Sequence, residues 1–280
     1  MNTTVYVASA FSKDGRGGNR AGVVLYQDEL GEGDKKLIAK KLGYSETAYV
    51  TASDKADLRI EYFTPAEEVP LCGHATIATF IIMMHLGKID KPSYKIETKS
   101  GILDIKIDGA TILMEQNKPE FFDVIGPDEL SPCFDIDCID RDSFSQIVST
   151  GLKDIIIPVR SEDLLGRMVP DFDRITEVSR RYDVVGMHLY ALEGDRIICR
   201  NFAPLYDIDE ESATGTSNCA LASLLYEKRG IIRDTYVFEQ GYSLGAPSEI
   251  RVRIEGDETG THVNRIFVGG AGYYIETLTI

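Results

Sequence analysis

Residues 68–87 read EVPLCGHATIATFIIMMHLG and contain the most apolar run of the chain. From His74 to His85, apolar residues occupy most of the circumference that a helix would present. A helix of that kind is buried on all sides, and this one is too short to span a bilayer. We therefore predict a central helix wrapped by other elements. Cys72 and His74 stand at its start, where backbone N–H groups are unpaired and carry a partial positive charge.

The sequence around this helix alternates between helical and strand patterns. The helical spacing of apolar and charged residues predicts a helix over residues 34–42 that ends at Gly43. Residues 58–63 alternate with period two, and residues 93–115 predict three short strands separated by turns. The glycine-rich residues 13–22 are followed by a strand pattern rather than a helix, which disfavours a nucleotide-binding loop. These patterns favour an α+β fold.

The chain contains an internal repeat. Residues 58–87 and 195–230 each show a strand, Phe-x-Pro, an acidic loop, a glycine and an apolar helix closed by glycine. We therefore predict two pseudo-symmetric domains, each with an antiparallel or mixed sheet around its long helix. The pattern breaks at NKPEFF, so we expect domains at 1–118 and 119–263, with a strand within 264–280 completing the first.

A pseudo-twofold relation between such domains would bring both helix starts, at Gly73 and Gly215, to an interdomain cleft. Helix N-termini attract anions, and glycine lets the backbone approach a ligand closely. We therefore expect the cleft to bind a small carboxylate, although the chain as a whole is acidic.

Bulk composition narrows the function classes. The 280 residues carry a net charge of −15, which argues against nucleic acid and anionic membranes as partners. The N-terminal residues show no basic region followed by an apolar region, so no signal peptide is expected. Five cysteines, an odd number, then suggest reduced thiols and a cytoplasmic location.

Three residues could carry chemistry, and each has a structural alternative. Glu46 follows the predicted helix stop. If apolar surroundings desolvate its carboxylate, the raised pKa would let Glu46 transfer a proton near neutral pH. The local sequence by itself favours an exposed loop glutamate. His74 either contacts a ligand or caps the helix. Cys72 is either an activated thiolate or a small buried residue. Cys72 and His74 supply only two zinc ligands, so we predict no metal.

Five stretches together resemble the phenazine-biosynthesis PhzF-like family, within the diaminopimelate epimerase-like superfamily. They are GGNRAGVV (17–24), LGYSETAYV (42–50), LRIEYFTPAEEVPLCGHATIA (58–78), SGILDI (100–105) and ATGTSNCALASLL (213–225). The resemblance covers nearly the whole chain. It implies the superfamily's α+β fold, in which two similar domains enclose the active site in a cleft.

The resemblance also implies roles for particular residues. Glu46 in SETA matches the family's catalytic glutamate, and His74 in CGHAT matches its cleft histidine. In EESATGT, Glu211 takes the place of a family aspartate as the third catalytic residue, and Thr216 takes the place of a serine. The substrate-binding residues expected from the same motifs are Asn19, Ser45, Gly73, Gly215 and Thr216.

The activity implied by the resemblance is a proton shift between carbons of a small carboxylate, of the trans-2,3-dihydro-3-hydroxyanthranilate isomerase type. It uses neither a metal nor an organic cofactor, and family members commonly form homodimers. One alternative is a thiol-based amino-acid epimerase or racemase. Cys72 matches its first thiol position, but Thr214 stands where the second thiol is expected. Another alternative is a non-catalytic metabolite-binding protein.

Overall fold

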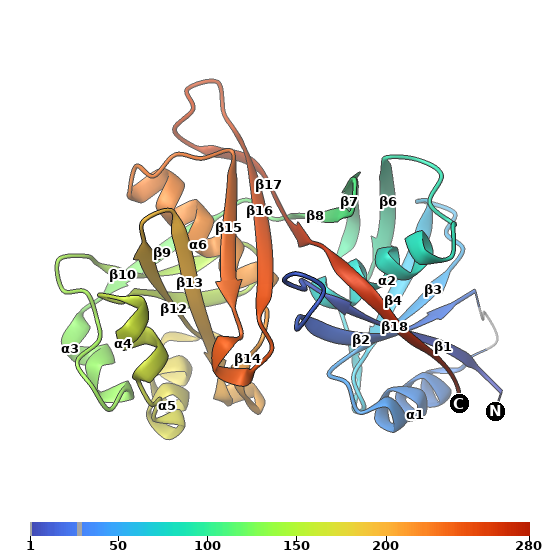
Figure 1. Ribbon diagram of the computed structural model, residues 1–280, viewed down its shortest axis with the longest axis horizontal. Helices are drawn as coiled ribbons and strands as arrows, with labels where there is room; N and C mark the ends of the chain where they lie inside the picture. The colour runs from blue at the N-terminus through green and yellow to red at the C-terminus, as the bar shows by residue number, and fades with distance from the viewer. Residues whose placement is uncertain (1, 27–29) are drawn as a thin grey trace. The chain divides into compact units, whose positions relative to one another are not determined.

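The computed structural model describes residues 2–26 and 30–280, and the chain forms two compact units (Figure 1). The N-terminal unit comprises Met1–Glu115 and Gly269–Ile280, and the C-terminal unit comprises Gln116–Val268. The chain therefore leaves the N-terminal unit once and returns to it at its end.

The N-terminal unit contains one mixed sheet around a central helix. Its strands pair in the order β18–β1–β2–β3–β4–β6–β7–β8, and only β2–β3 and β4–β6 are parallel. The strands are β1 (Thr4–Ala10), β2 (Asn19–Leu25), β3 (Thr47–Thr51), β4 (Leu58–Phe63), β5 (Glu68–Val69), β6 (Ser93–Thr98), β7 (Gly101–Asp108), β8 (Thr111–Gln116) and β18 (Gly272–Thr279). Helix α1 (Glu32–Leu42) connects β2 to β3, and α2 (Gly73–His85) lies between β5 and β6.

Helix α2 is the predicted central helix. It contacts β1, β2, β3 and β18, and its residues from His74 to Met83 are all buried. Its buried hydroxyl groups bond to the helix backbone: Thr79 Oγ1 donates to the Ala75 carbonyl at 2.9 Å. The polar residues of this segment are thus satisfied inside an apolar environment.

The C-terminal unit repeats the same topology. Its strands pair in the order β9–β10–β11–β12–β13–β15–β16, and only β11–β12 and β13–β15 are parallel. The strands are β9 (Glu120–Ile125), β10 (Ser145–Ser149), β11 (Lys153–Pro158), β12 (Gly186–Glu193), β13 (Arg196–Ala203), β14 (Ile208–Glu211), β15 (Thr235–Gln240), β16 (Ser248–Gly256) and β17 (Val263–Gly270). Its helices are α3 (Pro127–Leu130), α4 (Glu162–Arg167), α5 (Phe172–Tyr182) and α6 (Gly215–Lys228).

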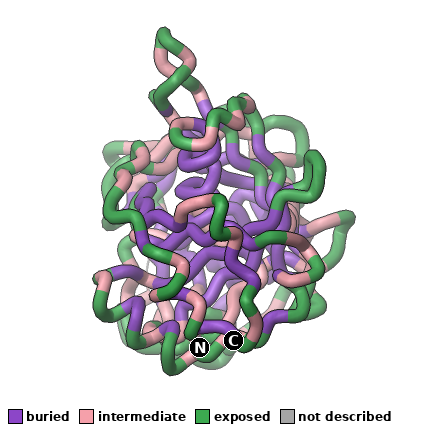
Figure 2. The backbone as a smooth tube through the Cα atoms, turned by 90° about the vertical axis from the view of Figure 1, so that its left-hand side faces the viewer, coloured by how far each residue is buried: buried purple, intermediate pink, exposed green. Residues whose placement is uncertain are grey.

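Helix α6 corresponds to α2. It contacts β10, β11 and β16, and Ser217 to Tyr226 are buried. The short strands β5 and β14 also correspond, because each pairs antiparallel with the strand before it. The predicted internal repeat is confirmed. Figure 2 shows buried residues concentrated inside and exposed residues in the outer turns.

Two local features differ from what a simple sequence pattern predicts. By period-two alternation Phe63 shares a face of β4 with the exposed Arg59, but it is buried because α1 covers that face, and it packs with Ile38 and Tyr49. Residues 162–182 form two helices, α4 and α5, rather than one continuous helix. Met168 is extended at the end of α4, and α5 then starts at a new cap, where the Asp171 carboxylate accepts a hydrogen bond from the Arg174 N–H.

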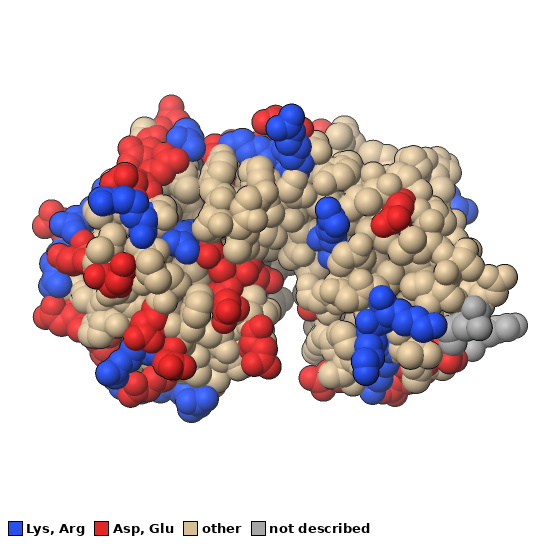
Figure 3. All heavy atoms as spheres, turned by 60° about the horizontal axis from the view of Figure 1, so that its bottom comes forward, with Lys and Arg blue, Asp and Glu red and all other residues tan. Residues whose placement is uncertain are grey.

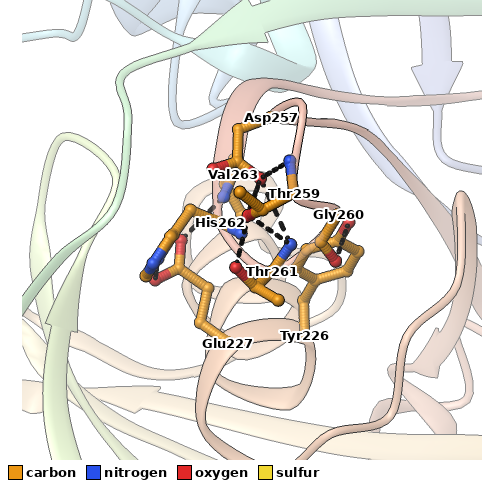
Figure 4. Close-up of polar contacts among 8 residues, drawn as sticks. All are labelled: Tyr226, Glu227, Asp257, Thr259, Gly260, Thr261, His262 and Val263. Atoms are coloured by element: carbon orange, nitrogen blue, oxygen red, sulfur yellow. Dashed lines mark hydrogen bonds and ion pairs between the residues drawn. The ribbon is translucent and has the colours of Figure 1, made fainter.

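The turn between β16 and β17 is fastened to the end of α6 (Figure 4). Asp257 Oδ1 accepts hydrogen bonds from the backbone N–H groups of Thr259, Thr261 and His262, which closes the turn. From α6, Tyr226 donates to the Gly260 carbonyl, and the Glu227 carboxylate accepts from the Val263 N–H and contacts His262.

Ion pairs are numerous on the outer surface. Figure 3 shows acidic and basic side chains intermixed on one face of the C-terminal unit. Arg196, for example, contacts both Glu162 and Glu239 at 2.9 and 3.0 Å. Within residues 2–26 and 30–280, no helix has the length and apolar character needed to cross a membrane.

Candidate active site

The end of α1 positions Glu46 at the edge of the sheet. The helix stops at Gly43, whose left-handed φ of 71° suits glycine, and β3 begins four residues later at Thr47. Strands β2 and β3 are parallel with Gly22 opposite Thr47, so Glu46 lies at the end of the sheet where both strands start. A Cβ on Gly22 would lie 2.5 Å from Leu42, so the end of α1 packs tightly on β2.

Glu46 meets His74 and Cys72 at the start of α2. Glu46 Oε2 lies 3.3 Å from His74 Nε2, and the Cys72 Sγ atom lies 3.5 Å from His74 Nδ1. The Glu46 side chain is 21% exposed and that of His74 is 10% exposed. Although Oε2 itself is buried and close to the imidazole, it forms no well-aligned hydrogen bond with the described residues. The carboxylate is therefore sheltered but retains an acceptor position.

Burial decides the charge state of His74. Desolvation lowers the pKa of its imidazole, and the nearby Glu46 carboxylate only partly opposes this effect. The imidazole is thus neutral near pH 7, with one nitrogen donating and the other accepting. A neutral imidazole can donate a hydrogen bond to developing negative charge without bringing a full charge into the site.

A buried hydroxyl pair supports the start of α2. Thr76 Oγ1 donates to the Cys72 carbonyl at 2.7 Å, so the Tyr62 hydroxyl must donate to Thr76 Oγ1, 2.6 Å away. Tyr62 belongs to β4, so this contact connects the sheet to the residue that precedes the helix.

The other predicted residues of the N-terminal unit lie at the same end of its sheet. Asn19 is the first residue of β2 and is partly buried, whereas Ser45 is exposed in the loop before Glu46. Gly73 is the first residue of α2. Of these positions, Glu46 and His74 are in direct contact, and Asn19 and Ser45 lie where β2 and β3 begin.

The predicted residues of the C-terminal unit lie around the start of α6. Glu211 ends β14, and its Oε2 accepts a hydrogen bond of 2.7 Å from Thr214 Oγ1. Thr214 caps α6 and Gly215 is its first residue. Thr216 follows in the first turn, where its carbonyl accepts from Thr150. Glu211 therefore lies four residues before the first residue of α6, the helix that corresponds to α2.

A buried polar network beneath α6 was not predicted from the sequence. Ser217 donates to Asp154 and accepts from Asn201, which contacts His188. His188 in turn contacts Asn218 at 3.2 Å. The network then continues from Asn218 through Gln240 to the Glu211 backbone and the Thr214 side chain. Its members come from β11, β12, β13, β15 and α6, so no local sequence pattern could reveal it.

Burial shifts both titratable groups of this network toward their neutral forms. It raises the pKa of Asp154 to about 6, against the opposing hydrogen bonds from Ser217 and Gly186. It lowers the pKa of His188 to about 4. The two other histidines also have partners that spacing did not indicate: His85 stacks on Tyr274, and His262 contacts Glu227.

The comparisons with known proteins agree with this architecture. A family model described as phenazine biosynthesis-like protein, PhzC-PhzF, matches residues 8–277. The chain belongs to the PhzC-PhzF family.

Relatives of this PhzC-PhzF chain are named as isomerases. It is 33% identical to the uncharacterized isomerase YfhB of Bacillus subtilis, over 96% of this chain and 95% of the relative. It is 34% identical to an uncharacterized isomerase of Deinococcus radiodurans, over 90% and 86%. These relatives support an isomerase or epimerase-like role for the PhzC-PhzF chain.

Solved structures show the same fold. A PhzF-family protein of Bacillus anthracis superposes with a TM-score of 0.91 at 28% identity, covering 100% of this chain and 99% of that one. A hydroxyproline epimerase from Agrobacterium vitis superposes with a TM-score of 0.65 at 12% identity, covering 100% and 91%. The second similarity concerns the fold alone. The predicted diaminopimelate epimerase-like α+β fold is thus confirmed.

Proposed function

We propose that this PhzC-PhzF chain is a cofactor-independent isomerase that moves a proton between two carbons of a small carboxylate. The observation that carries the proposal is the Glu46 carboxylate, sheltered from solvent and 3.3 Å from the His74 imidazole. A sheltered carboxylate with an available acceptor position is suited to act as a general base and then as a general acid.

The proposed reaction has two proton transfers by one residue. Glu46 removes a proton from an acidic C–H of the substrate, and the protonated carboxyl group returns it to another carbon. Negative charge develops on the substrate between the two steps. A hydrogen bond from the neutral His74 imidazole would stabilise that charge.

The start of α2 provides a further attraction for the substrate. The first amides of the helix, from Gly73 and His74, have no intrahelical acceptor, and the helix dipole favours negative charge at this end. We assign these amides to the substrate carboxylate. Gly73 leaves room for this contact, because it has no side chain.

Three further assignments complete the proposal. As their motif implies, Glu211 would act in catalysis and Thr216 would bind the substrate. Asn19 and Ser45 would bind substrate near Glu46. The substrate class is that of trans-2,3-dihydro-3-hydroxyanthranilate, a cyclic carboxylate with an acidic ring C–H.

Label uptake from deuterated water tests the role of Glu46. Candidate carboxylates are incubated with wild type, Glu46→Gln and Cys72→Ala, and incorporation is measured by mass spectrometry. We expect Glu46→Gln to reduce incorporation at least 100-fold, since it removes the base, and Cys72→Ala to retain most of it. Equal incorporation by wild type and Glu46→Gln would refute the mechanism.

A thiol-based epimerase is the second candidate, because Cys72 Sγ contacts the His74 ring. Such a reaction needs a second thiol on the other face of the substrate. Thr214 stands at the corresponding helix start, and Cys219 is completely buried within α6. In the label-uptake experiment, this candidate predicts loss with Cys72→Ala and retention with Glu46→Gln.

A further inference from the structure

Three different metal-binding groups meet at the start of α2. Glu46, Cys72 and His74 each offer one ligand atom, and these atoms lie within 4.8 Å of one another. The sequence suggested only Cys72 and His74 as a pair. The fold adds the third group, because the loop before β3 brings Glu46 to the helix start.

The spacing of these atoms is close to that of ligands on one tetrahedral ion. Zinc bonds of about 2.0 Å to nitrogen and oxygen place those two atoms about 3.3 Å apart, and a thiolate bond of about 2.3 Å places sulfur about 3.5 Å from the nitrogen. Here His74 Nε2 lies 3.3 Å from Glu46 Oε2 and 3.9 Å from Cys72 Sγ. Cys72 Sγ lies nearer to His74 Nδ1, at 3.5 Å, than to Nε2, so the thiol has to rotate toward the Nε2 side of the ring before all three atoms can share one ion.

The three ligands are held by the backbone rather than by chance rotamers of surface residues. Cys72 and His74 are fixed by the first turn of α2 and by the Thr76 bond to the Cys72 carbonyl. Both are buried, and Glu46 Oε2 is buried without a hydrogen bond to any residue that the structure describes. The exposed part of the Glu46 side chain gives an ion a route from solvent.

We propose that Glu46, Cys72 and His74 form an inhibitory binding site for a divalent cation of the zinc type. On binding, the Cys72 thiol releases its proton to solvent and its sulfur bonds to the ion. His74 binds through Nε2 and keeps its hydrogen on Nδ1, and Glu46 binds through Oε2. The fourth position is open to water, as in zinc sites with three protein ligands.

The ligand set selects among cations. A thiolate and an imidazole favour zinc, whereas magnesium and calcium prefer oxygen ligands. Occupation of the site would hold the Glu46 carboxylate on the ion. The inhibitory effect therefore rests on the proposed function, because it assumes that Glu46 transfers the proton, but the metal binding itself does not.

Competition with a chromophoric zinc chelator tests the site directly. Full-length protein is freed of metal and titrated with zinc, and we expect one zinc per chain. Cys72→Ser and Glu46→Gln should each weaken the affinity at least tenfold. His262→Ala is the matched control, because His262 and Glu227 form another histidine–carboxylate pair, and its zinc affinity should equal that of wild type.

Cobalt provides a second measurement that reports the sulfur ligand. Cobalt-loaded wild type should show a thiolate-to-cobalt charge-transfer absorption, and Cys72→Ser should lose it while its circular dichroism remains that of wild type. Zinc affinity unchanged in both Cys72→Ser and Glu46→Gln, or equal affinity for magnesium, would overturn the site.

The label-uptake assay separates the two proposals. Zinc-loaded wild type should incorporate no deuterium, and chelation should restore incorporation. If zinc binds through Cys72 and incorporation continues, the inhibitory role is wrong and the isomerase proposal stands. If metal-free protein incorporates no label from any carboxylate, the isomerase proposal fails, while the chelator titration still decides the metal site.

Discussion

Tyr62 and Thr76 illustrate how single buried hydroxyl groups hold the candidate active site. Neither side chain belongs to the group around Glu46, yet their hydrogen bonds fix the residue from which α2 starts. Thr76 acts as acceptor for Tyr62 and as donor to Cys72, so removing one partner has a different effect from removing the other.

Tyr62→Phe should be the milder of two changes at this pair. Thr76 keeps its bond to the Cys72 carbonyl, so the protein loses one buried hydrogen bond and about 1 kcal/mol of unfolding free energy. Thr76→Val should cost more, because it leaves the Tyr62 hydroxyl buried without an acceptor. Urea unfolding of both variants measures the difference; a larger loss for Tyr62→Phe would contradict the assigned donor direction.

The raised pKa of Asp154 predicts how the unfolding free energy changes with pH. Its folded pKa of about 6 lies above its ordinary value of 3.8, so its stabilising contribution is complete below about pH 4 and is lost as pH rises through 6. Relative to Asp154→Asn, wild type should lose up to roughly 3 kcal/mol of unfolding free energy between about pH 4 and 7. His188 titrates in both proteins, so its effect cancels. A difference independent of pH would contradict the shifted pKa.

At this scale the sequence could predict some site residues and not others. Glu46 and His74 came from the resemblance, since the local sequence of Glu46 favoured an exposed loop. Their contact spans 28 residues and depends on how α1, β3 and α2 pack. Asp154 and His188 carried no signal, because their partners are distant in sequence and their burial is a property of the folded sheet.

Among the elements of the C-terminal unit, β13, β14 and α4 are joined by one arginine. Arg200 forms two hydrogen bonds with the Glu210 carboxylate and donates to the carbonyls of Leu165 and Met168. Both charged side chains are about nine-tenths buried. A buried pair of this kind is costly to break, because the remaining charge has no partner.

Glu210→Gln should therefore lower the unfolding free energy by about 3 kcal/mol. Glu162→Gln, which removes one acceptor from the exposed Arg196, should cost less than about 1 kcal/mol. Denaturant unfolding of the two variants gives the comparison. Similar losses for both would show that burial does not distinguish these ion pairs.

The turn of residues 257–262 gives a prediction that amide exchange can check. Asp257→Ala removes the acceptor shared by the Thr259, Thr261 and His262 amides (Figure 4). These amides should exchange faster with solvent, while amides in the middle of α6 keep their wild-type rates. Hydrogen exchange followed by mass spectrometry measures both regions, and unchanged exchange in the turn would refute the role of Asp257.

Elements with strong local patterns were predictable. The apolar circumference of α2 and the stop of α1 at Gly43 both appear as expected. Tertiary contacts override the local pattern at other positions. Phe63 alternates with residues that face outward, but the covering helix α1 makes its side of the sheet a second core.

Two features organise the whole molecule. The chain contains two similar units, and the late strand β18 belongs to the N-terminal one. The internal repeat was visible because both halves retain the strand, Phe-x-Pro and apolar-helix order. The sequence could not specify the sheet pairing. In particular, β18 pairs with β1 across more than 260 residues, with a register shift between Val7 and Ala8.

Removing β18 should therefore damage the N-terminal unit more than the C-terminal unit. A chain ending at residue 270 would expose the edge of β1 and one side of α2. We expect amides of β1 and α2 to lose protection against hydrogen exchange, while those of β12 and α6 remain protected. Equal loss in the two units would contradict the division between them.

The late position of β18 also bears on how the protein is made. During translation, all of residues 116–268 leave the ribosome before the strand that covers β1, so the C-terminal unit is able to reach its final pairing first. Strand β1 therefore leaves the ribosome long before its partner β18. Until β18 emerges, the edge of β1 and one side of α2 lack the strand that contacts them in the folded protein.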